Sequence, residues 1–186
     1  MVNFKTQVTI IGGGPSGLLL SQLLMNEGIK TIVLEKHTKS HVLSRIRAGV
    51  LESGTVEILK QAGVGERIDT DGFVHEGTYL SSENKGFRVS FSETVGKSVT
   101  IFGQTEVTKD LYQKQEEREA NIFFKVKNVN IVDPKCSKTE VIFEDKIGKE
   151  NKIVSDFIIG CDGFHGVTRQ RIPLSQRKEY ERIYPF

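Results

Sequence analysis

The chain has 186 residues, which is room for one sizeable domain or for one domain with part of a second. Hydrophobic residues make up 37% of it, an ordinary balance for a globular protein, and a formal net charge of +2 with interspersed signs argues against a nucleic-acid-binding surface. No apolar run approaches the roughly 18 residues of a membrane span, and the polar start argues against a signal peptide.

The first elements in the chain form a strand, a glycine turn and a helix. Four β-branched residues close a predicted strand at residues 6–11, and residues 16–27 show helical apolar spacing. Between them, Gly12, Gly14 and Gly17 match the pattern G-x-G-x-x-G. The three glycines allow a tight turn, a close approach of the backbone to a diphosphate, and close packing of helix on strand. The helix N-terminus then faces the phosphates.

A second buried strand at residues 31–34 ends at Glu35 and completes a βαβ unit. Glu35 stands 18 residues after Gly17, close to where an acidic residue accepts hydrogen bonds from a ribose diol. A carboxylate there repels a 2′-phosphate, so we expect NADP to be disfavoured at this turn. The alternative is a strand–helix turn that binds nothing.

The next segment, residues 36–47, is polar and basic without sustained periodicity, and we expect a solvated loop that includes Lys39 and His41. Arg45 and Arg47 alternate around Ile46. In an extended chain both side chains lie on one face, where guanidinium groups suit phosphate oxygens. The sequence leaves phosphate binding and simple solvation equally open for this pair.

The middle of the chain predicts helices and a small sheet. An amphipathic helix is expected from about Ala48 to Gly63, with a short continuation at residues 64–68. Strands of one small sheet are expected at residues 74–80, 88–91 and 99–102, with a hairpin connection at residues 84–86. Thr105 is a candidate cap for a helix that runs to about Ala120. Its charged run at residues 109–119 predicts a solvated face.

The later part of the chain reads as β structure. Residues 122–125 predict a return strand of the parallel sheet. Residues 126–132, 139–143 and 151–154 predict a β-meander, with turns near Asp133-Pro134 and Ile147-Gly148. Residues 156–161 predict another buried strand. The cysteines Cys136 and Cys161 form no C-x-x-C pair and no metal-ligand set, so reduced thiols of a cytoplasmic protein are expected.

A second glycine-rich segment follows that last strand, where open α/β sheets place their ligands. Asp162 can accept hydrogen bonds from following N–H groups, and Gly163 and Gly166 permit backbone crowding. A simple helix cap is the alternative for Asp162. His165 and Arg169 stand four residues apart, so a helical turn would present both on one face.

Together these segments resemble the single-component FAD-dependent aromatic hydroxylases. The resemblance rests on residues 12–17 with Glu35, residues 45–52 (RIRAGVLE), 102–107 (FGQTEV) and 161–166 (CDGFHG). It covers residues 6–186 but only the N-terminal half of the family pattern. It implies an α/β, Rossmann-like FAD-binding fold, with a parallel sheet and a β-meander, plus part of a smaller β-sheet substrate domain. The implied domains are residues 1–72 and 99–178 for FAD binding, 73–98 for the substrate-domain sheet, and 179–186 for the start of a truncated substrate domain.

The resemblance also implies roles for single residues. The turn would hold the diphosphate of FAD and Glu35 its ribose, while the segment from Arg45 to Val50 and Gln104 hold more of the nucleotide. Arg47, His165 and Arg169 would receive NADPH, and Asp162 belongs to a motif associated with both cofactors. The implied cofactor-binding residues are Gly12, Gly14, Ser16, Gly17, Glu35, Arg45, Ile46, Arg47, Ala48, Gly49, Val50, Gln104, Asp162, His165 and Arg169. No catalytic residue and no metal ligand is implied.

The activity implied is hydroxylation of 4-hydroxybenzoate to 3,4-dihydroxybenzoate with FAD, NADPH and O2, by a cytoplasmic enzyme that forms a homodimer at full length. Three alternatives stay open: another phenolic substrate, a truncated non-catalytic nucleotide-binding remnant, and an NAD-dependent dehydrogenase. The last leaves residues 162–169 unexplained.

The family's second flavin segment and its substrate-binding residues are missing, and the chain stops at residues 184–186. We therefore expect a truncated gene, a partial reading frame or a fragment, inactive alone. We also expect the isolated chain to bind FAD weakly and to aggregate, because interior sheet surface is left bare.

Overall fold

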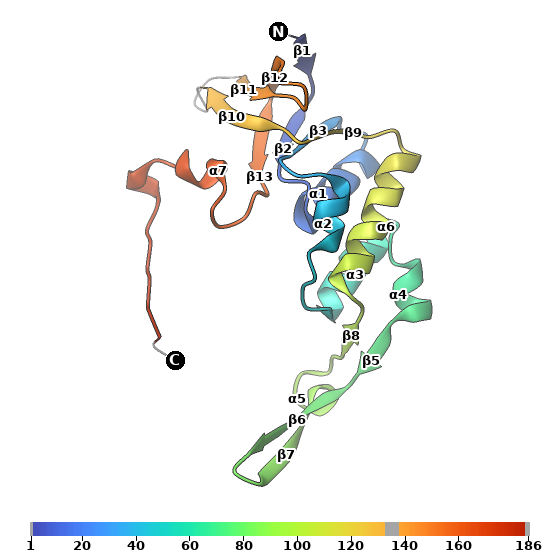
Figure 1. The fold of residues 1–186 in the computed structure, drawn as a ribbon. Coiled ribbons are helices and arrows are strands. Elements are labelled where there is room, and N and C mark those ends of the chain that lie inside the picture. Colours follow the sequence, from blue (N-terminus) through green and yellow to red (C-terminus); the bar gives the residue numbers. More distant parts are fainter. Residues whose placement is uncertain (1, 133–137, 185–186) are drawn as a thin grey trace.

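The structure is a computed structural model that describes residues 2–132 and 138–184. Cys136 and the predicted turn at Asp133-Pro134 lie outside the described residues. The fold is α/β, as predicted, with a parallel sheet between a helical layer and a second sheet (Figure 1). In order, the strands of the parallel sheet are β13 (Phe157–Gly160), β2 (Val8–Ile11), β3 (Thr31–Glu35) and β9 (Asn121–Phe124).

The βαβ unit forms as predicted. All four residues of β2 and all five of β3 are buried, as expected for strands covered on both faces. Between them, helix α1 (Pro15–Asn26) has a proline at its first position, where the missing N–H costs nothing. Val8, Ile10 and Val33 pack against α1, whereas Ile11, Ile32 and Leu34 face the second sheet.

The second sheet contains the predicted β-meander. Strands β10 (Lys127–Val132), β11 (Thr139–Glu144) and β12 (Glu150–Ser155) pair antiparallel in that order. A further strand, β1 (Val2–Lys5), pairs parallel with β12, with Phe4 opposite Ile153. The predicted strand at residues 6–11 did not include it, since β1 is short and its partner lies 149 residues further along. The fully buried Val141, Phe143 and Ile153 form the centre of this layer.

The segment after β3 differs from the predicted loop. It contains a short helix, α2 (Lys39–Ser44), whose first turn is capped by the Thr38 side chain accepting from the amide of His41 at 3.0 Å. The expected helix start near Ala48 is also wrong, because the chain there is extended and forms β4 (Val50–Glu52). The helices that follow are α3 (Ser53–Gln61) and α4 (Glu66–Asp71).

The middle of the chain forms two β structures instead of the single small sheet expected. Strand β8 (Val99–Ile101) lies between β4 and β5 (Phe73–His75), whereas β6 (Gly77–Ser82) and β7 (Lys85–Ser90) form a separate hairpin that projects from the body (Figure 1). Its turn is at Glu83 and Asn84, both with positive φ. A strand was expected to reach Phe91, but Ser90 caps a helix there, α5 (Phe91–Val95).

The long charged helix is α6 (Gln104–Glu117), and its N-cap is Gly103 instead of the expected Thr105. Most of its charges face outward as predicted, while Leu111, Tyr112 and Gln115 are buried against α1. One hydrophobic cluster joins α6 to Leu18 of α1 and to Leu59 of α3. This packing brings the start of α6 beside the glycine turn.

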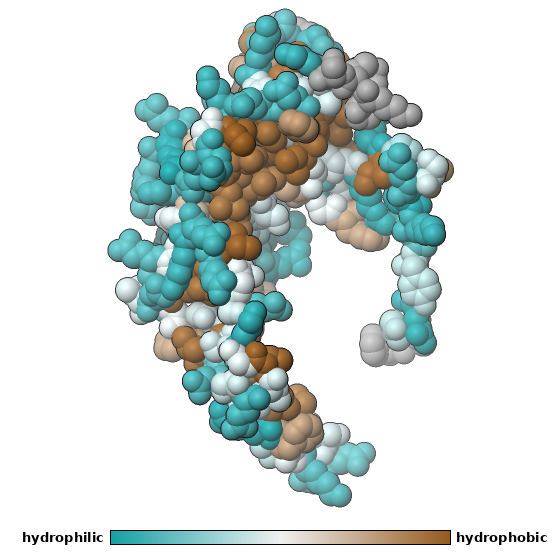
Figure 2. Space-filling model, turned by 180° about the vertical axis from the view of Figure 1, so that it is seen from behind, coloured by the Kyte–Doolittle hydropathy of each residue, from teal (hydrophilic) through white to brown (hydrophobic). Residues whose placement is uncertain are grey.

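The chain ends with α7 (Val167–Gln170) and the 3₁₀ helix η1 (Leu174–Gln176), after which it runs away from the body (Figure 1). Figure 2 shows apolar surface gathered along the concave side of the molecule. Large exposed apolar side chains of the described residues include Phe73, Tyr79, Phe87, Phe157 and Leu174. Phe157 begins β13, so this strand is not buried as expected, because it lies at the edge of the parallel sheet. No helix in the described ranges is both long and apolar enough to span a bilayer.

Candidate nucleotide-binding site

A cleft of about 680 Å³ lies at the carboxyl ends of β2, β3 and β13. This is where an open parallel sheet places its ligands, and the volume lies in the range of small-molecule sites. The predicted site residues that line it are Gly12, Gly14, Glu35, Arg45, Arg47, Gln104, Asp162 and His165. The cleft thus gathers segments that are up to about 150 residues apart in the sequence.

The glycine turn has the geometry that its sequence predicted. Gly12 has a φ of +110°, and a Cβ there would lie 2.3 Å from the carbonyl oxygen of Cys161. A Cβ on Gly17 would lie 1.9 Å from the carbonyl oxygen of Gly12. Gly14 differs, because a Cβ there would meet nothing within 4 Å. Two glycines are therefore required by packing, while Gly14 keeps space free at the cleft.

Backbone N–H groups are available at this turn. Gly14 caps α1 and its carbonyl accepts from the amide of Leu18 at 3.0 Å. In the described part of the chain, no hydrogen bond engages the amides of Gly14, Ser16 or Gly17. Free amides at a helix N-terminus, together with the helix dipole, favour a phosphate group. The turn therefore fits the diphosphate of a dinucleotide.

Glu35 is buried in the wall of the cleft at the tip of β3. Its Oε2 accepts a hydrogen bond from the amide of Gly13 and its Oε1 one from the amide of His37, each at 2.8 Å. Carboxylate oxygens can accept more than one hydrogen bond, so a ribose diol can still be received. Glu35 thus holds the glycine turn in place and keeps acceptor capacity for a ligand.

The segment from Arg45 to Val50 lines the cleft through two of its residues. Arg45 is extended and, with Arg47, lines the cleft, whereas Ile46 is 89% exposed. Ala48 is also exposed. Gly49 packs on the start of α6, where a Cβ would lie 2.7 Å from Cα of Gly103, and the Gly49 carbonyl accepts from the amide of Phe102 at 2.7 Å. Val50 is exposed and lies opposite Ile101 in the β4–β8 pair.

Asp162 lies at the end of β13, lines the cleft and caps the following helix. Its carboxylate accepts from the amide of Thr168 at 3.0 Å and from the Thr168 hydroxyl. Gly166 packs so closely that a Cβ would collide with this carboxylate. Burial, and then the charge of Asp162, raise the pKa of the neighbouring Cys161 thiol, which is therefore a neutral wall group.

The structure separates the three predicted NADPH contacts. Arg47 and the exposed His165 line the cleft, and His165 precedes α7 instead of sharing its helical turn with Arg169. Arg169 lies at a second cavity of about 720 Å³, which Ser16 also lines. Its guanidinium stacks 3.9 Å from the centroid of the Phe164 ring and pairs with Glu179 at 3.0 Å.

Several wall residues were missed by the sequence reasoning. The start of β10 contributes Lys127, Asn128 and Val129 to the cleft. The signal for their position is the return strand β9, which ends beside Glu35 and delivers the chain to this edge. His37 was also missed; its ring stacks on that of His41 with centroids 4.1 Å apart.

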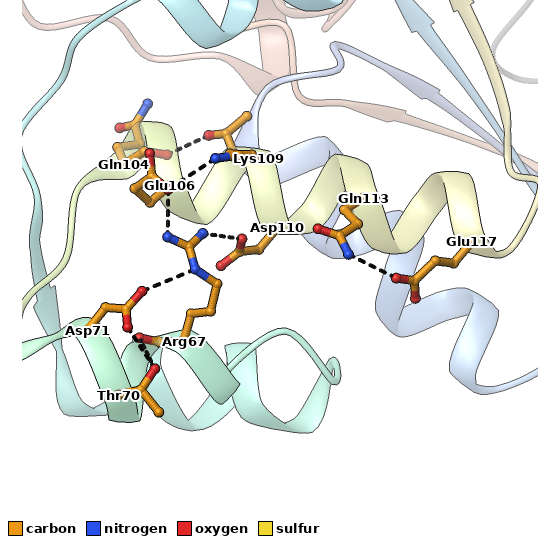
Figure 3. A network of polar contacts seen from close by, with 10 residues as sticks. Arg67, Thr70, Asp71, Gln104, Glu106, Lys109, Asp110, Gln113 and Glu117 are labelled. Carbon is orange, nitrogen blue, oxygen red and sulfur yellow. Dashed lines mark hydrogen bonds and ion pairs between the residues drawn. The ribbon is translucent and has the colours of Figure 1, made fainter.

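A charged cluster outside the cleft supports the start of α6 (Figure 3). Arg67 of α4 bonds to Asp71 at 3.2 Å, to Glu106 at 2.8 Å and to Asp110 at 2.6 Å. Its guanidinium also lies 5.6 Å from the centroid of the Phe102 ring. The hydrogen bond from Arg67 lowers the pKa of Glu106. Because α6 begins at Gln104, this cluster fixes the helix end that reaches the cleft.

Comparison with protein families gives the identity of the domain. The sequence profile of the FAD-binding domain family matches residues 5–186. The chain belongs to this family. The glycine turn, its free amides and the buried Glu35 have the geometry of a dinucleotide-binding site, in agreement with this family.

Two proteins of known name are similar to this chain in sequence. It is 44% identical over 187 residues to p-hydroxybenzoate hydroxylase of Acinetobacter baylyi, an alignment that covers 100% of this chain and 46% of that protein. It is 24% identical over 188 residues to 4-methyl-5-nitrocatechol 5-monooxygenase of a Burkholderia species, covering 94% of this chain and 34% of that one. The chain spans half or less of the length of these relatives.

Solved structures share the fold at low sequence identity. p-Nitrophenol 4-monooxygenase of Pseudomonas putida superposes with a TM-score of 0.79 at 18% identity, over 92% of this chain and 44% of that one. PqsL of Pseudomonas aeruginosa, described as a probable FAD-dependent monooxygenase, gives 0.74 at 17% identity, over 97% and 48%. The Rossmann-like FAD-binding fold expected from the sequence is therefore confirmed.

Proposed function

We propose that this chain is the N-terminal part of an FAD-dependent monooxygenase that uses NADPH and O2 to hydroxylate 4-hydroxybenzoate to 3,4-dihydroxybenzoate. The observation that carries the proposal is the 44% identity to p-hydroxybenzoate hydroxylase along the whole chain. The cleft supports it, because an intact glycine turn and a buried Glu35 lie in one wall.

In this proposal the described residues bind and orient the cofactor. The free amides of Gly14, Ser16 and Gly17 hold the diphosphate, and Glu35 accepts from the ribose diol. Arg45 to Val50 and Gln104 hold the rest of the nucleotide. Bound FAD supplies the redox chemistry between NADPH and O2, while the protein supplies position and electrostatics.

NADPH binding is assigned to cationic side chains outside the turn, since Glu35 repels a 2′-phosphate there. Arg47 and His165 lie in the cleft, and Arg169 lies at the adjoining cavity. A 2′-phosphate favours such groups over a carboxylate. We propose the same domain division as expected from the sequence: the FAD-binding domain comprises residues 1–72 and 99–178, and the substrate-domain sheet comprises residues 73–98.

The test uses the longest protein that the gene encodes, purified and analysed for bound flavin. It should contain FAD, and its NADPH oxidation should accelerate with 4-hydroxybenzoate and yield 3,4-dihydroxybenzoate. Faster turnover of another phenol would establish the alternative substrate. Failure to bind FAD would contradict the proposal and favour a non-catalytic remnant. Sedimentation of the same sample tests the proposed homodimer, and cell fractionation tests the proposed cytoplasmic location.

A further inference from the structure

Tyr112 of α6 reaches the glycine turn from the protein interior. Its side chain is 1% exposed, and its hydroxyl donates a hydrogen bond to the carbonyl of Gly13 at 2.7 Å. The two residues are 99 positions apart in the sequence. The ring lies 5.8 Å from that of Phe124 between centroids, and the ammonium of Lys39 lies 5.5 Å from its centroid. Tyr112 is thus fixed by packing on the side of the turn away from the cleft.

Gly13 is held at both of its backbone polar groups. Its amide donates to Glu35 at 2.8 Å, and its carbonyl accepts from Tyr112. A Cβ on Gly13 would lie 2.8 Å from Cβ of Glu35, so no side chain fits at this position. The contact from β3 fixes the peptide that joins Gly12 to Gly13, and the contact from α6 fixes the peptide that joins Gly13 to Gly14.

That peptide links the hydroxyl to the cleft. In a planar trans peptide the C=O and the following N–H point in opposite directions. The carbonyl of Gly13 points to the buried Tyr112, so the amide of Gly14 points away from Tyr112. Gly14 lines the cleft, has open space at its Cα, and its amide has no hydrogen-bond partner among residues 2–132 and 138–184.

We propose that Tyr112 is a positioning residue for the diphosphate of the nucleotide: by holding the Gly13 carbonyl, its hydroxyl aims the Gly14 amide into the cleft. This role rests on the proposed binding of FAD. It adds a residue from outside the glycine motif, in a helix whose sequence reads as a charged surface element.

The hydroxyl is suited to this role at neutral pH. Burial raises the pKa of Tyr112, and the nearby charge of Glu35 raises it further, so the group stays protonated and remains a donor. A carbonyl oxygen can only accept, which fixes the direction of the hydrogen bond.

The test compares Tyr112→Phe with a matched loss of a buried hydroxyl, Thr139→Val. Thr139 lies in β11, and its hydroxyl donates to the carbonyl of Ser155 at 3.0 Å, in the second sheet. Tyr112→Phe loses one buried hydrogen bond, whereas Thr139→Val also loses the contact of its hydroxyl with Oγ of Ser155 at 3.2 Å. Both variants should unfold at lowered temperatures, and the control should be destabilised at least as much as Tyr112→Phe. Tyr112→Phe should weaken FAD and ADP binding by roughly three- to tenfold, as expected for one hydrogen bond. Adenosine, which lacks the diphosphate, should bind equally to all three proteins.

Each outcome separates the two proposals. If the wild-type protein binds FAD and Tyr112→Phe binds FAD and ADP as tightly, the positioning role is wrong and the proposed function stands. If Tyr112→Phe weakened the binding of ADP and of adenosine equally, the positioning role would also be wrong, because such a result indicates general disorder of the site. A wild-type protein that binds no FAD would contradict both. Amide hydrogen exchange at Gly13 provides a readout without ligand, and exchange that is no faster in Tyr112→Phe than in Thr139→Val would overturn the role.

Discussion

Gly17 and Gly12 touch backbone to backbone, with room for no side chain between them. A Cβ on Gly17 would lie 1.9 Å from the carbonyl oxygen of Gly12, and one on Gly12 would lie 2.3 Å from the carbonyl oxygen of Cys161. Helix α1 and strands β2 and β13 therefore meet at a single crowded point. Gly14, two residues from Gly12, faces open space instead. Glycines of one motif are thus required for two different physical reasons.

These glycines should respond differently to the same substitution. Gly17→Ala forces α1 away from β2, and we expect it to destabilise the protein by about 3 kcal/mol or more. Gly14→Ala has space and an ordinary φ of −77°, so the expected change in stability is below about 1 kcal/mol. Its methyl group, however, occupies the nucleotide space and should weaken FAD binding at least about tenfold. Thermal unfolding and FAD titration measure the two effects; equal destabilisation by both variants would contradict the assignment.

Glu35→Gln should change which nucleotides bind. The amide keeps the size of the side chain but removes its charge and replaces one acceptor oxygen, while the amides of Gly13 and His37 both need acceptors. We expect about tenfold weaker binding of ADP. Adenosine 2′,5′-bisphosphate should lose less, because the repulsion of its 2′-phosphate disappears. Titration of both nucleotides checks this, and an unchanged ratio of their affinities would show that Glu35 does not face the ribose.

Arg67→Met should release α4 from α6. The cluster is partly exposed, so the expected loss of stability is about 1 kcal/mol near neutral pH. Because Arg67 lowers the pKa of Glu106, this contribution is present above the ordinary carboxyl pKa and is lost as pH falls through the lowered value. The variant should therefore lose less further stability on acidification than wild type. Lys60→Met breaks the exposed pair with Asp69 and is the control; similar curves for both variants would contradict a special role for Arg67.

His37 should titrate below an ordinary histidine. Partial burial lowers its pKa, the ring of His41 lowers it further, and Glu35 opposes both. The unfolded chain then binds more protons than the folded one near the ordinary histidine pKa of about 6.5, so stability should fall as the pH drops through this value and level off below the lowered pKa of His37. His41→Gln should raise the pKa of His37 and reduce this fall, as NMR titration and unfolding curves would record. The control is His75→Gln, in β5, which should leave the pKa of His37 unchanged.

Arg169→Ala, in the longest protein the gene encodes, should raise KM for NADPH several-fold and leave FAD content unchanged. The guanidinium is already paired with Glu179, so Glu179→Gln should free it and lower KM. An unchanged KM in Arg169→Ala would defeat the proposed NADPH role. Arg88→Ala removes an arginine from the β6–β7 hairpin and is the matched control.

The structural elements that were predicted correctly are those encoded by local sequence patterns. The βαβ unit was predictable because strand, turn and helix lie within 30 residues and each has its own apolar period. The meander was predictable from alternation, which the burial of Thr139, Val141 and Phe143 reproduces on one face of β11. The return strand β9 was also predicted correctly as a member of the parallel sheet, whereas its pairing with β3 is seen only in the structure.

Errors occurred where distant partners decide the structure. Residues 50–52 resemble the start of a helix in the local sequence but form β4, because the strand that pairs with them, β8, lies about 50 residues later. β1 was missed for the same reason. Helix α2 carried a local signal, the capping Thr38, that was overlooked within a polar segment. Tyr112 stands in a charged run that was correctly expected to be solvated, and only the packing of α6 on α1 reveals its bond to the glycine turn.

The strand order β13-β2-β3-β9 has a consequence for synthesis on the ribosome. β2 is made first among these strands and lies inside the sheet, yet its neighbour β13 is made about 150 residues later. Until then one edge of β2 is unpaired, and the nascent chain exposes an apolar strand that pairs readily with other strands. The backbone contact of Gly12 with Cys161, and the hydrogen bond from the amide of Cys161 to the carbonyl of Ile11, also form only when β13 is in place. A nucleotide can therefore be held at this turn only after the chain has left the exit tunnel as far as Cys161 and Asp162.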